Sequence, residues 1–450
     1  AVERDASWLT ALEALGLQAV TRKDHAQLAE VLGKEAAVLT EDQHHRAAVL
    51  THRARLLHRR LAKPEAAIEA FQAALELDAR TPVALAALKR LLFAQARWRD
   101  LVAAHERAAS LTTDPAMQTW SWWTIGRLHD QRLGLKDDAA KAYEHAARIT
   151  PTSPHILEEL VQLYAELGHR EGQADALERL ASAVARPVDK LSIYMRLGRL
   201  FDGAEGDPSV AARWYEAALA IEAAYAPALQ ALDLIYESRG AHLERAAIYA
   251  RAGEAPVASA RRADAHVRAA VIYDEALEKP EQAVAHYQKA LALEPKRTTA
   301  FNGLVRLLVG ARRYPELAEV YDRAVDAAES EDIAISYLFK IASLHEDVMR
   351  DVELAVATYE RILARDPKHL GALHALQRSA VAAGELDTAI GAYDAEAELT
   401  QDTSRRVELE HRAAVLVQDG LGDLEQARKR FEVLGRRAPE HLPTLQSLGR

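Results

Sequence analysis

A single period of 72 residues runs through the chain and limits its possible folds more than any other feature. Six large aromatic residues follow one another at this step: Phe71, Tyr143, Tyr215, Tyr287, Tyr359 and Phe431. Four residues before each of them lies an alanine: Ala67, Ala139, Ala211, Ala283, Ala355 and Ala427. A third column holds only small residues: Ala54, Gly126, Gly198, Ala270, Ala342 and Ala414. Six copies in register predict a repeat protein whose units stack on their neighbours.

Within one period the apolar residues recur at helical spacing. Ala283, Tyr287 and Leu291 lie at steps of four, which places them on one face of a helix. Pro280 suits the first turn of that helix, and Pro295 ends it because proline cannot continue a helix. The same spacing in the residues that follow gives four helices per period, arranged as two hairpins.

The composition agrees with an all-helical chain. Alanine, the best helix former, is over-represented, while the 450 residues include only 20 Gly and 15 Pro. Runs of β-branched residues are nearly absent, which disfavours a β-sandwich or a parallel α/β sheet. The lack of cysteine excludes disulfide scaffolds, cysteine zinc sites and thiol catalysis. The bias toward alanine and arginine indicates a GC-rich, bacterial genome.

The small columns predict where helices approach one another closely. A small residue on one helix is expected to face a small residue on its partner, and the large aromatic is expected to wedge against the next hairpin. A larger side chain at Ala54 or its equivalents would force the helices apart. One hairpin cannot bury its apolar face alone, so stacking supplies the core.

These columns resemble the tetratricopeptide repeat. Three hairpins carry its pattern: Trp122, Ile125, Gly126, His129, Ala139, Tyr143, Ala146 and Pro151; Tyr194, Leu197, Gly198, Phe201, Ala211, Tyr215 and Ala218; Leu338, Ile341, Ala342, Ala355, Tyr359, Ile362 and Pro367. Relative to the family pattern these hairpins have one extra residue in the turn before the alanine, and the alternate hairpins diverge further. The resemblance covers essentially the whole chain. It implies an all-α fold, a right-handed α-solenoid or superhelix of about a dozen helical hairpins.

The resemblance also sets the expected domain organisation. We expect residues 1–450 to form a single tetratricopeptide-like solenoid, with residues 1–43 as an incomplete or divergent first hairpin. The last helix, residues 441–450, is expected to have no partner helix after it. Because natural solenoid ends carry polar caps, such an end predicts a fragment of a longer array.

The sequence contains no enzyme signature. It lacks the phosphate-binding loop, the HExxH zinc motif, the GxSxG elbow and the EF-hand loop, so we expect no catalysis and no cofactor. A metal site is considered at His44, His45, His52 and His58. No pair of histidines four residues apart with a helping carboxylate is present, which favours solvated surface histidines and no metal. No apolar run is long enough for a membrane span.

The resemblance implies a concave face lined by positions 2, 5, 9, 12 and 13 of the first helix in each hairpin. Position 9 is arginine in six hairpins: Arg55, Arg90, Arg127, Arg199, Arg306 and Arg378. A guanidinium group holds a carboxylate through two parallel hydrogen bonds. Trp120 at position 2 and Trp123 at position 5 accompany them, a composition typical of binding hot spots. Trp122 at position 4 is expected in the core. The candidate ligand is an acidic segment with an apolar anchor.

A structural interpretation of the same arginines stays open. Arg127 lies three residues before Asp130, a spacing common in solvated ion pairs on helices. The arginines can also neutralise acids at positions 12 and 13, such as Asp274 and Glu346. The family's clamp for acidic chaperone C-termini is disfavoured, because no position 5 is lysine and no position 9 is asparagine.

Three functions follow from these observations. The leading one is a non-enzymatic protein–protein interaction scaffold that binds a peptide or protein on its concave face. The alternative is a structural component that stacks or polymerises through its solenoid ends. A helical-repeat nucleic-acid binder is the least favoured, because a net charge of −10 opposes phosphate contacts. A cytoplasmic location is favoured, although the sequence does not determine the compartment.

Overall fold

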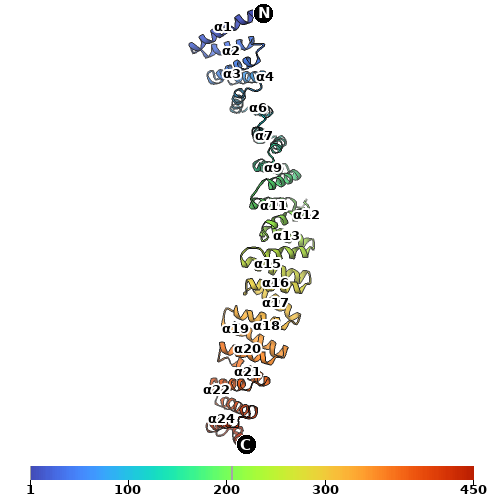
Figure 1. Ribbon diagram of the computed structural model, residues 1–450, viewed down its shortest axis with the longest axis vertical. Helices are drawn as coiled ribbons and strands as arrows, with labels where there is room; N and C mark the ends of the chain where they lie inside the picture. Colours follow the sequence, from blue (N-terminus) through green and yellow to red (C-terminus); the bar gives the residue numbers. More distant parts are fainter. Residues whose placement is uncertain (1, 204–205, 450) are drawn as a thin grey trace. The chain divides into compact units, whose positions relative to one another are not determined.

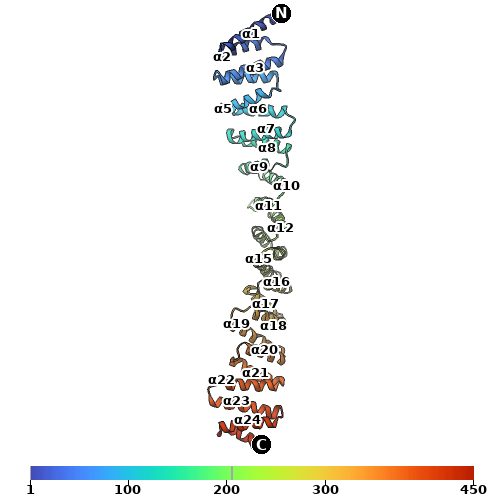
Figure 2. The same ribbon diagram turned by 60° about the vertical axis from the view of Figure 1, so that its left-hand side comes forward.

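The computed structural model describes residues 2–203 and 206–449, with side chains from Trp8 onward. Contacts group the chain into unit 1, residues 1–221, and unit 2, residues 222–450. Within each unit successive helices lie side by side in chain order, as Figure 1 and Figure 2 both show. The described residues contain helices and turns and no strand, which confirms the predicted all-α fold.

Unit 1 consists of six helical hairpins in its described residues. Its helices are α1 (Val2–Thr21), α2 (His25–Val38), α3 (Gln43–Arg59), α4 (Pro64–Leu77), α5 (Pro82–Ala94), α6 (Trp98–Leu111), α7 (Pro115–Leu128), α8 (Lys136–Ile149), α9 (Pro154–Leu167), α10 (Arg170–Ala183), α11 (Pro187–Phe201) and α12 (Pro208–Ile221). A short π-helical segment, η1 (His129–Leu133), extends α7.

Unit 2 continues the same pattern through a further six hairpins and one last helix. Its helices are α13 (Ala226–Ser238), α14 (His242–Gly253), α15 (Ser259–Val271), α16 (Pro280–Leu293), α17 (Thr298–Gly310), α18 (Tyr314–Asp326), α19 (Glu331–Ser343), α20 (Val352–Arg365), α21 (Leu370–Ala383), α22 (Leu386–Leu399), α23 (Thr403–Val415), α24 (Leu424–Arg437) and α25 (Leu442–Leu448). Three π-helical segments follow α15, α19 and α23: η2 (Ile272–Ala276), η3 (Leu344–Met349) and η4 (Leu416–Gly420). The prediction of about a dozen hairpins is confirmed.

Most helix boundaries follow the residues that predicted them. Helix α16 begins at Pro280, as its proline indicates, and ends before Pro295. At the N-terminus α1 and α2 form a hairpin with Leu12 and Leu28 buried. The last helix is shorter than expected, since α25 covers only Leu442–Leu448 and Arg450 lies outside the described residues. That residues 1–450 form a single solenoid stays a prediction.

After four of these first helices, α7, α15, α19 and α23, the extra residue lies in a π-helical segment at the helix end, which corrects the expectation that it lies in the turn. A π-helical turn holds one more residue than an α-helical turn. Five backbone N–H groups each donate to a carbonyl six residues earlier, at the 72-residue period: Lys63 to Leu57, Leu135 to His129, Lys279 to Tyr273, Asp351 to His345 and Asp423 to Val417, with N–O distances between 2.7 and 3.2 Å. The chain then reverses through one left-handed residue, for example Gly134 or Arg350.

The column of small residues to which Gly126 and Gly198 belong faces an aromatic ring. This corrects the expectation that it faces another small residue. A Cβ atom added to Gly126 would lie 2.5 Å from Cε1 of Tyr143 in the same hairpin. At Gly198 the corresponding distance, to Cε1 of Tyr215, is 2.3 Å. The ring therefore occupies the space that a side chain at these positions would need.

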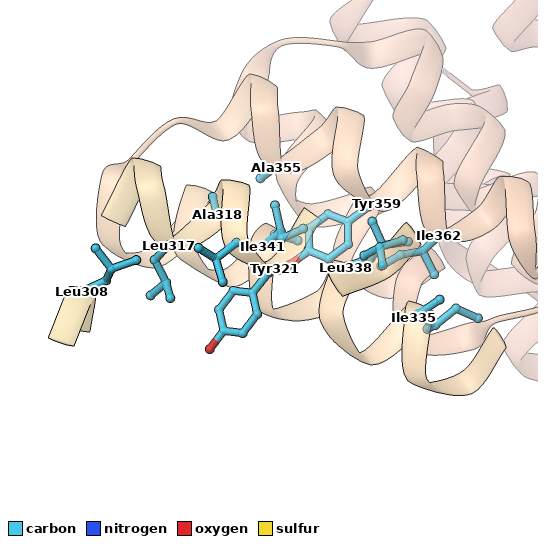
Figure 3. Packing of buried hydrophobic residues seen from close by; sticks show 14 of the residues in the cluster. Leu308, Leu317, Ala318, Tyr321, Ile335, Leu338, Ile341, Ala355, Tyr359 and Ile362 are labelled. Atoms are coloured by element: carbon cyan, nitrogen blue, oxygen red, sulfur yellow. The ribbon is translucent and has the colours of Figure 1, made fainter. Parts of the chain in front are cut away.

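The predicted wedge between hairpins is present in unit 2. A Cβ atom added to Gly303, on α17, would lie 2.4 Å from Cζ of Tyr287 on α16. The Tyr287 ring is therefore packed between its own hairpin and the next one. Figure 3 shows the neighbouring core, where Leu338 and Ile341 of α19 lie against Tyr359 of α20.

We expect leucine in the alanine column to overpack the core. Ala211 and Ala355 are both fully buried. The variants Ala211→Leu and Ala355→Leu should each lower the free energy of unfolding by about 2 kcal/mol, because the extra methylenes must displace packed neighbours. Urea denaturation measures the loss, with the exposed Ala357→Leu as the matched control. Unchanged midpoints for both buried variants would show that the column is not a close contact.

Candidate interaction surface on the first helices

The six predicted arginines all have exposed side chains on the first helices of hairpins. They are Arg55 on α3, Arg90 on α5, Arg127 on α7, Arg199 on α11, Arg306 on α17 and Arg378 on α21. In unit 2 both arginines pair with an acid of the preceding hairpin. Arg306 pairs with Asp274. Arg378 donates from Nε and Nη2 to the two carboxylate oxygens of Glu346, both at 3.1 Å. These two ion pairs are the ones expected if the arginines neutralise acids of the chain itself.

In unit 1 the arginines have no such partner. The guanidinium carbon of Arg127 lies 4.9 Å from the ring centroid of Trp123, and its Nη2 donates to Gln131 Oε1 at 3.2 Å. Asp130 is not its partner, although the sequence spacing allowed it. Across the part of the chain that the structure describes, no ion pair is formed by the four arginines of unit 1: Arg55, Arg90, Arg127 and Arg199.

The neighbouring hairpin explains why Arg90 differs from Arg306. Asp274 lies 32 residues before Arg306 in the sequence. The residue at the same distance before Arg90 is His58. A histidine in that place cannot supply a permanent negative charge. Arg90 therefore remains available to an outside carboxylate.

Two acids of this column also accept hydrogen bonds from tyrosine hydroxyls, whereas the Tyr143 hydroxyl is buried without a partner in the described residues. Tyr215 donates to Asp202 at 3.2 Å, and Tyr359 donates to Glu346 at 2.9 Å. Burial raises the pKa of Tyr215 to about 12, so its hydroxyl stays protonated and donates. The four hairpins with a tyrosine all carry an acid thirteen residues earlier: Asp130, Asp202, Asp274 and Glu346. The two hairpins with phenylalanine instead carry His58 and Gln418 there. This pairing is visible in the sequence, although the expectations above did not include it.

Trp120 faces the hairpin that precedes α7. Its ring centroid lies 5.3 Å from that of His105 on α6, and the Lys89 ammonium lies 5.3 Å from the ring. The cation beside Trp120 is therefore Lys89. Burial lowers the pKa of His105 to about 4, with Lys89 adding to the shift, so His105 is neutral at pH 7. Trp120 itself remains 45% exposed.

The other two tryptophans pack more deeply. Trp122 is half-buried, packs against both core clusters of unit 1 and stacks on His145, with ring centroids 4.5 Å apart. Trp123 is also half-buried and lies 5.4 Å from His155 of α9. Its indole Nε1 is buried without an acceptor in the described residues. Trp123 thus contacts the next hairpin as well as the groove that position 5 is expected to line.

We call the group of Trp120, Trp123, Lys89 and Arg127 the α7 surface. It combines two indole rings, one of them well exposed, with two cationic groups. Such a surface offers apolar contact and charge-assisted hydrogen bonds to a carboxylate. Lys89 is the member that sequence reasoning missed, because only the stacking of the hairpins brings it to Trp120.

Two of the histidines considered as metal ligands lie beside different acids. His44 Nδ1 is 3.2 Å from Asp78 Oδ2, and His45 Nε2 is 4.0 Å from Glu35 Oε1. The described residues include no group of three or more histidine or acidic side chains that could hold a metal ion. The described helices also include none that is both long and apolar enough to cross a bilayer.

A pair of histidines in unit 2, of which His266 is buried and His286 half-buried, is sensitive to protonation. His266 Nδ1 lies 3.1 Å from His286 Nδ1, so one ring donates and the other accepts. Glu254 lies 3.8 Å from His266, Lys289 pairs with Glu254, and the Tyr273 ring stacks on His286. Burial lowers the pKa of His286 to about 4, assisted by its neighbour His266 and by Lys289. Burial also lowers the pKa of His266.

We expect this pair to make the fold acid-labile. In the unfolded chain both histidines take up protons near pH 6.5, whereas in the folded chain the pKa of His286 is about 4 and that of His266 is also lowered by burial. The contribution to stability is therefore complete above pH 6.5 and is lost as pH falls toward 4. The variant His286→Phe keeps the stacking and removes the titration, so its stability should depend less steeply on pH in this window. Urea denaturation at several pH values measures this, with the exposed His155→Phe as control; parallel curves for His286→Phe and wild type would contradict it.

Comparison with known proteins agrees with the hairpin architecture. A family profile described as tetratricopeptide repeat matches residues 47–81 and 263–297, and a second profile of the same description matches residues 336–369. Superkiller protein 3 of Schizosaccharomyces pombe is 33% identical over 112 residues, which are 25% of this chain and 8% of that protein. The match therefore spans less than a tenth of that relative's length.

Two solved structures that are similar to the chain have low sequence identity to it. The structure of Naa15/Naa10 bound to HypK-THB has 15% identity and a TM-score of 0.33, with 95% of this chain and 68% of that chain covered. YrrB, described as a TPR protein with an unusual peptide-binding site, has 21% identity and a TM-score of 0.23, covering 42% of this chain and 92% of that chain. The three profile matches begin in α3, α15 and α19, first helices of the hairpins that set the 72-residue period. The chain therefore contains tetratricopeptide repeats at residues 47–81, 263–297 and 336–369.

Proposed function

We propose that the chain is a non-enzymatic interaction scaffold that binds a protein or peptide partner at the α7 surface of unit 1. The partner segment combines a carboxylate with an apolar anchor. The observation that carries this proposal is the difference between the arginines of the two units. Arg306 and Arg378 already hold carboxylates of the chain itself, whereas Arg127 rests on an indole ring and holds none.

The chemistry of Arg127 suits an incoming carboxylate. Its contact with the Trp123 ring is a cation–π interaction, which orients the guanidinium while leaving most of its N–H donors for another acceptor. Gln131 uses one of those donors through a neutral and weaker hydrogen bond. A bidentate pair with a carboxylate is stronger, so a ligand can replace this contact.

The apolar anchor would lie on Trp120. This ring is 45% exposed, and exposed tryptophan beside a cation is enriched among residues that dominate binding energies. Lys89, held against the same ring, adds a second positive charge near the anchor. An acidic segment gains from both cations, whereas a basic one is repelled.

The experiment compares two arginines that differ only in their partners. Acidic peptides with one leucine, and basic peptides of the same length, are titrated onto the full chain by fluorescence anisotropy. Arg127→Gln should weaken binding of the acidic peptides about thirtyfold, because loss of a central arginine typically costs about 2 kcal/mol. Arg378→Gln, whose guanidinium is already paired, should leave it unchanged.

Three outcomes would contradict the proposal. Equal loss in both variants would indicate a general charge effect. Equal binding of acidic and basic peptides would show that the surface does not select carboxylates. Binding that ignores Arg127→Gln would place the interaction elsewhere.

A further inference from the structure

Three aromatic rings of unit 2 meet where two hairpins pack together, with Tyr321 buried and Phe301 and Tyr337 half-buried. Phe301 of α17 lies 5.9 Å from Tyr321 of α18 and 5.6 Å from Tyr337 of α19, measured between ring centroids. The two tyrosine rings are 6.0 Å apart. Figure 3 shows Tyr321 with its hydroxyl pointing away from the other labelled core residues. We call this group the three-ring cluster.

A cation of the chain itself already rests on this cluster. The Lys340 ammonium, on α19, lies 5.3 Å from the Tyr321 centroid and 5.2 Å from the Tyr337 centroid. Lys340 is exposed, and within the described part of the chain it forms no ion pair. An exposed lysine that lies on two ring faces and on no carboxylate indicates that the rings attract positive charge.

The space beside the cluster can accept a further side chain. Phe301 lines two hollows, of about 350 and 430 Å³, which also share Pro295 and Ala324. Asp326 lines the first hollow, together with the cation Arg323. Glu329 lines the second together with Lys340 and with Lys296, with which it is paired at 3.5 Å. The segment from 326 to 332 carries four acids and no basic residue.

We propose that the three-ring cluster is a binding site for the cationic side chain of a basic peptide segment, arginine or methylated lysine. Lys340 occupies the site when that segment is absent. A guanidinium or quaternary ammonium group is less strongly hydrated than the Lys340 ammonium, so it loses less on leaving water and gains the same attraction to the rings. This exchange favours the incoming cation. The site lies in unit 2 and is independent of the α7 surface.

The test uses the full chain and three short peptides that differ in one side chain. The central residue is arginine, trimethyl-lysine or the neutral norleucine, and binding is followed through NMR shifts of labelled tyrosine rings. Both cationic peptides should give saturable shifts, and the norleucine peptide should give none. Lys340→Met removes the internal competitor and should raise the affinity of the cationic peptides about two- to fivefold.

Two variants that each remove one aromatic ring test the same site. Tyr337→Leu and Phe301→Leu, both at half-buried positions, should abolish the shifts while far-UV circular dichroism stays native. The stronger of the two cationic peptides identifies the side chain that the site prefers. The proposal is overturned if norleucine binds equally well, if Lys340→Met fails to raise the affinity, or if neither cationic peptide binds. Arg127→Gln should leave these shifts unchanged, which keeps this result separate from the proposed function.

Discussion

Replacing Gly198 with leucine is expected to lower the free energy of unfolding by about 3 kcal/mol, the upper end of the usual cost of overpacking. The added Cβ atom would begin 2.3 Å from Cε1 of Tyr215, well inside van der Waals contact. The Tyr215 ring is 2% exposed and its hydroxyl is held by Asp202, so it cannot swing away without breaking that hydrogen bond. Urea denaturation followed by circular dichroism measures the loss.

A second glycine provides a matched control. Gly391 also lies inside a helix, α22, but an added Cβ atom would meet nothing within 4 Å. Leucine is a better helix former than glycine, so Gly391→Leu should leave stability unchanged or raise it by up to about 1 kcal/mol. If both variants lost stability equally, the ring contact would not be the cause of the loss at Gly198.

Truncating Trp122 is expected to cost about 3 kcal/mol of stability, whereas truncating Trp120 should cost less than about 1 kcal/mol. Trp122 packs against both core clusters of unit 1 and stacks on His145, so Trp122→Ala opens a cavity between them. Trp120 is 45% exposed and contacts the His105 ring and the Lys89 ammonium. The two variants are compared by thermal melting and by urea denaturation.

The comparison also separates packing from binding on α7. Trp120→Ala should weaken the acidic peptides of the proposed function while the fold stays stable. Trp122→Ala should lower stability first, and any effect on binding should follow from that loss. Equal destabilisation by the two variants would show that all the tryptophans of α7 are core residues, and the α7 surface would then lack its apolar anchor.

Much of the fold could be predicted because its causes are local. The proline that opens α16 and the apolar step of four act within one helix, and these signals do not depend on distant residues. The columns of residues that recur every 72 positions also made the packing between neighbouring hairpins predictable, since stacked repeats bury the same positions in every copy. The aromatic column is buried in all six copies, as the register predicted.

The partners of individual side chains could not be predicted in the same way. An extra residue between two columns can be absorbed in a turn or in a helix. Only the hydrogen bond from the Arg350 N–H to the His345 carbonyl, five residues earlier, and its equivalents decide for a π-helical segment. Likewise, a column of small residues shows that another group packs closely there. It does not show whether that group is a second helix or, as at Gly126, an aromatic ring.

The sequence by itself determined the helical hairpins, their number and the columns that form the core, because hydrophobic spacing and proline act over a few residues. Only the tertiary structure decided which arginines are free. Arg378 and Arg127 look alike in the sequence, but the preceding hairpin brings Glu346 to the first, whereas the second lies on the ring of Trp123. Ion pairs between hairpins depend on the distance between charged atoms from separate helices, and the stacking of the hairpins sets that distance.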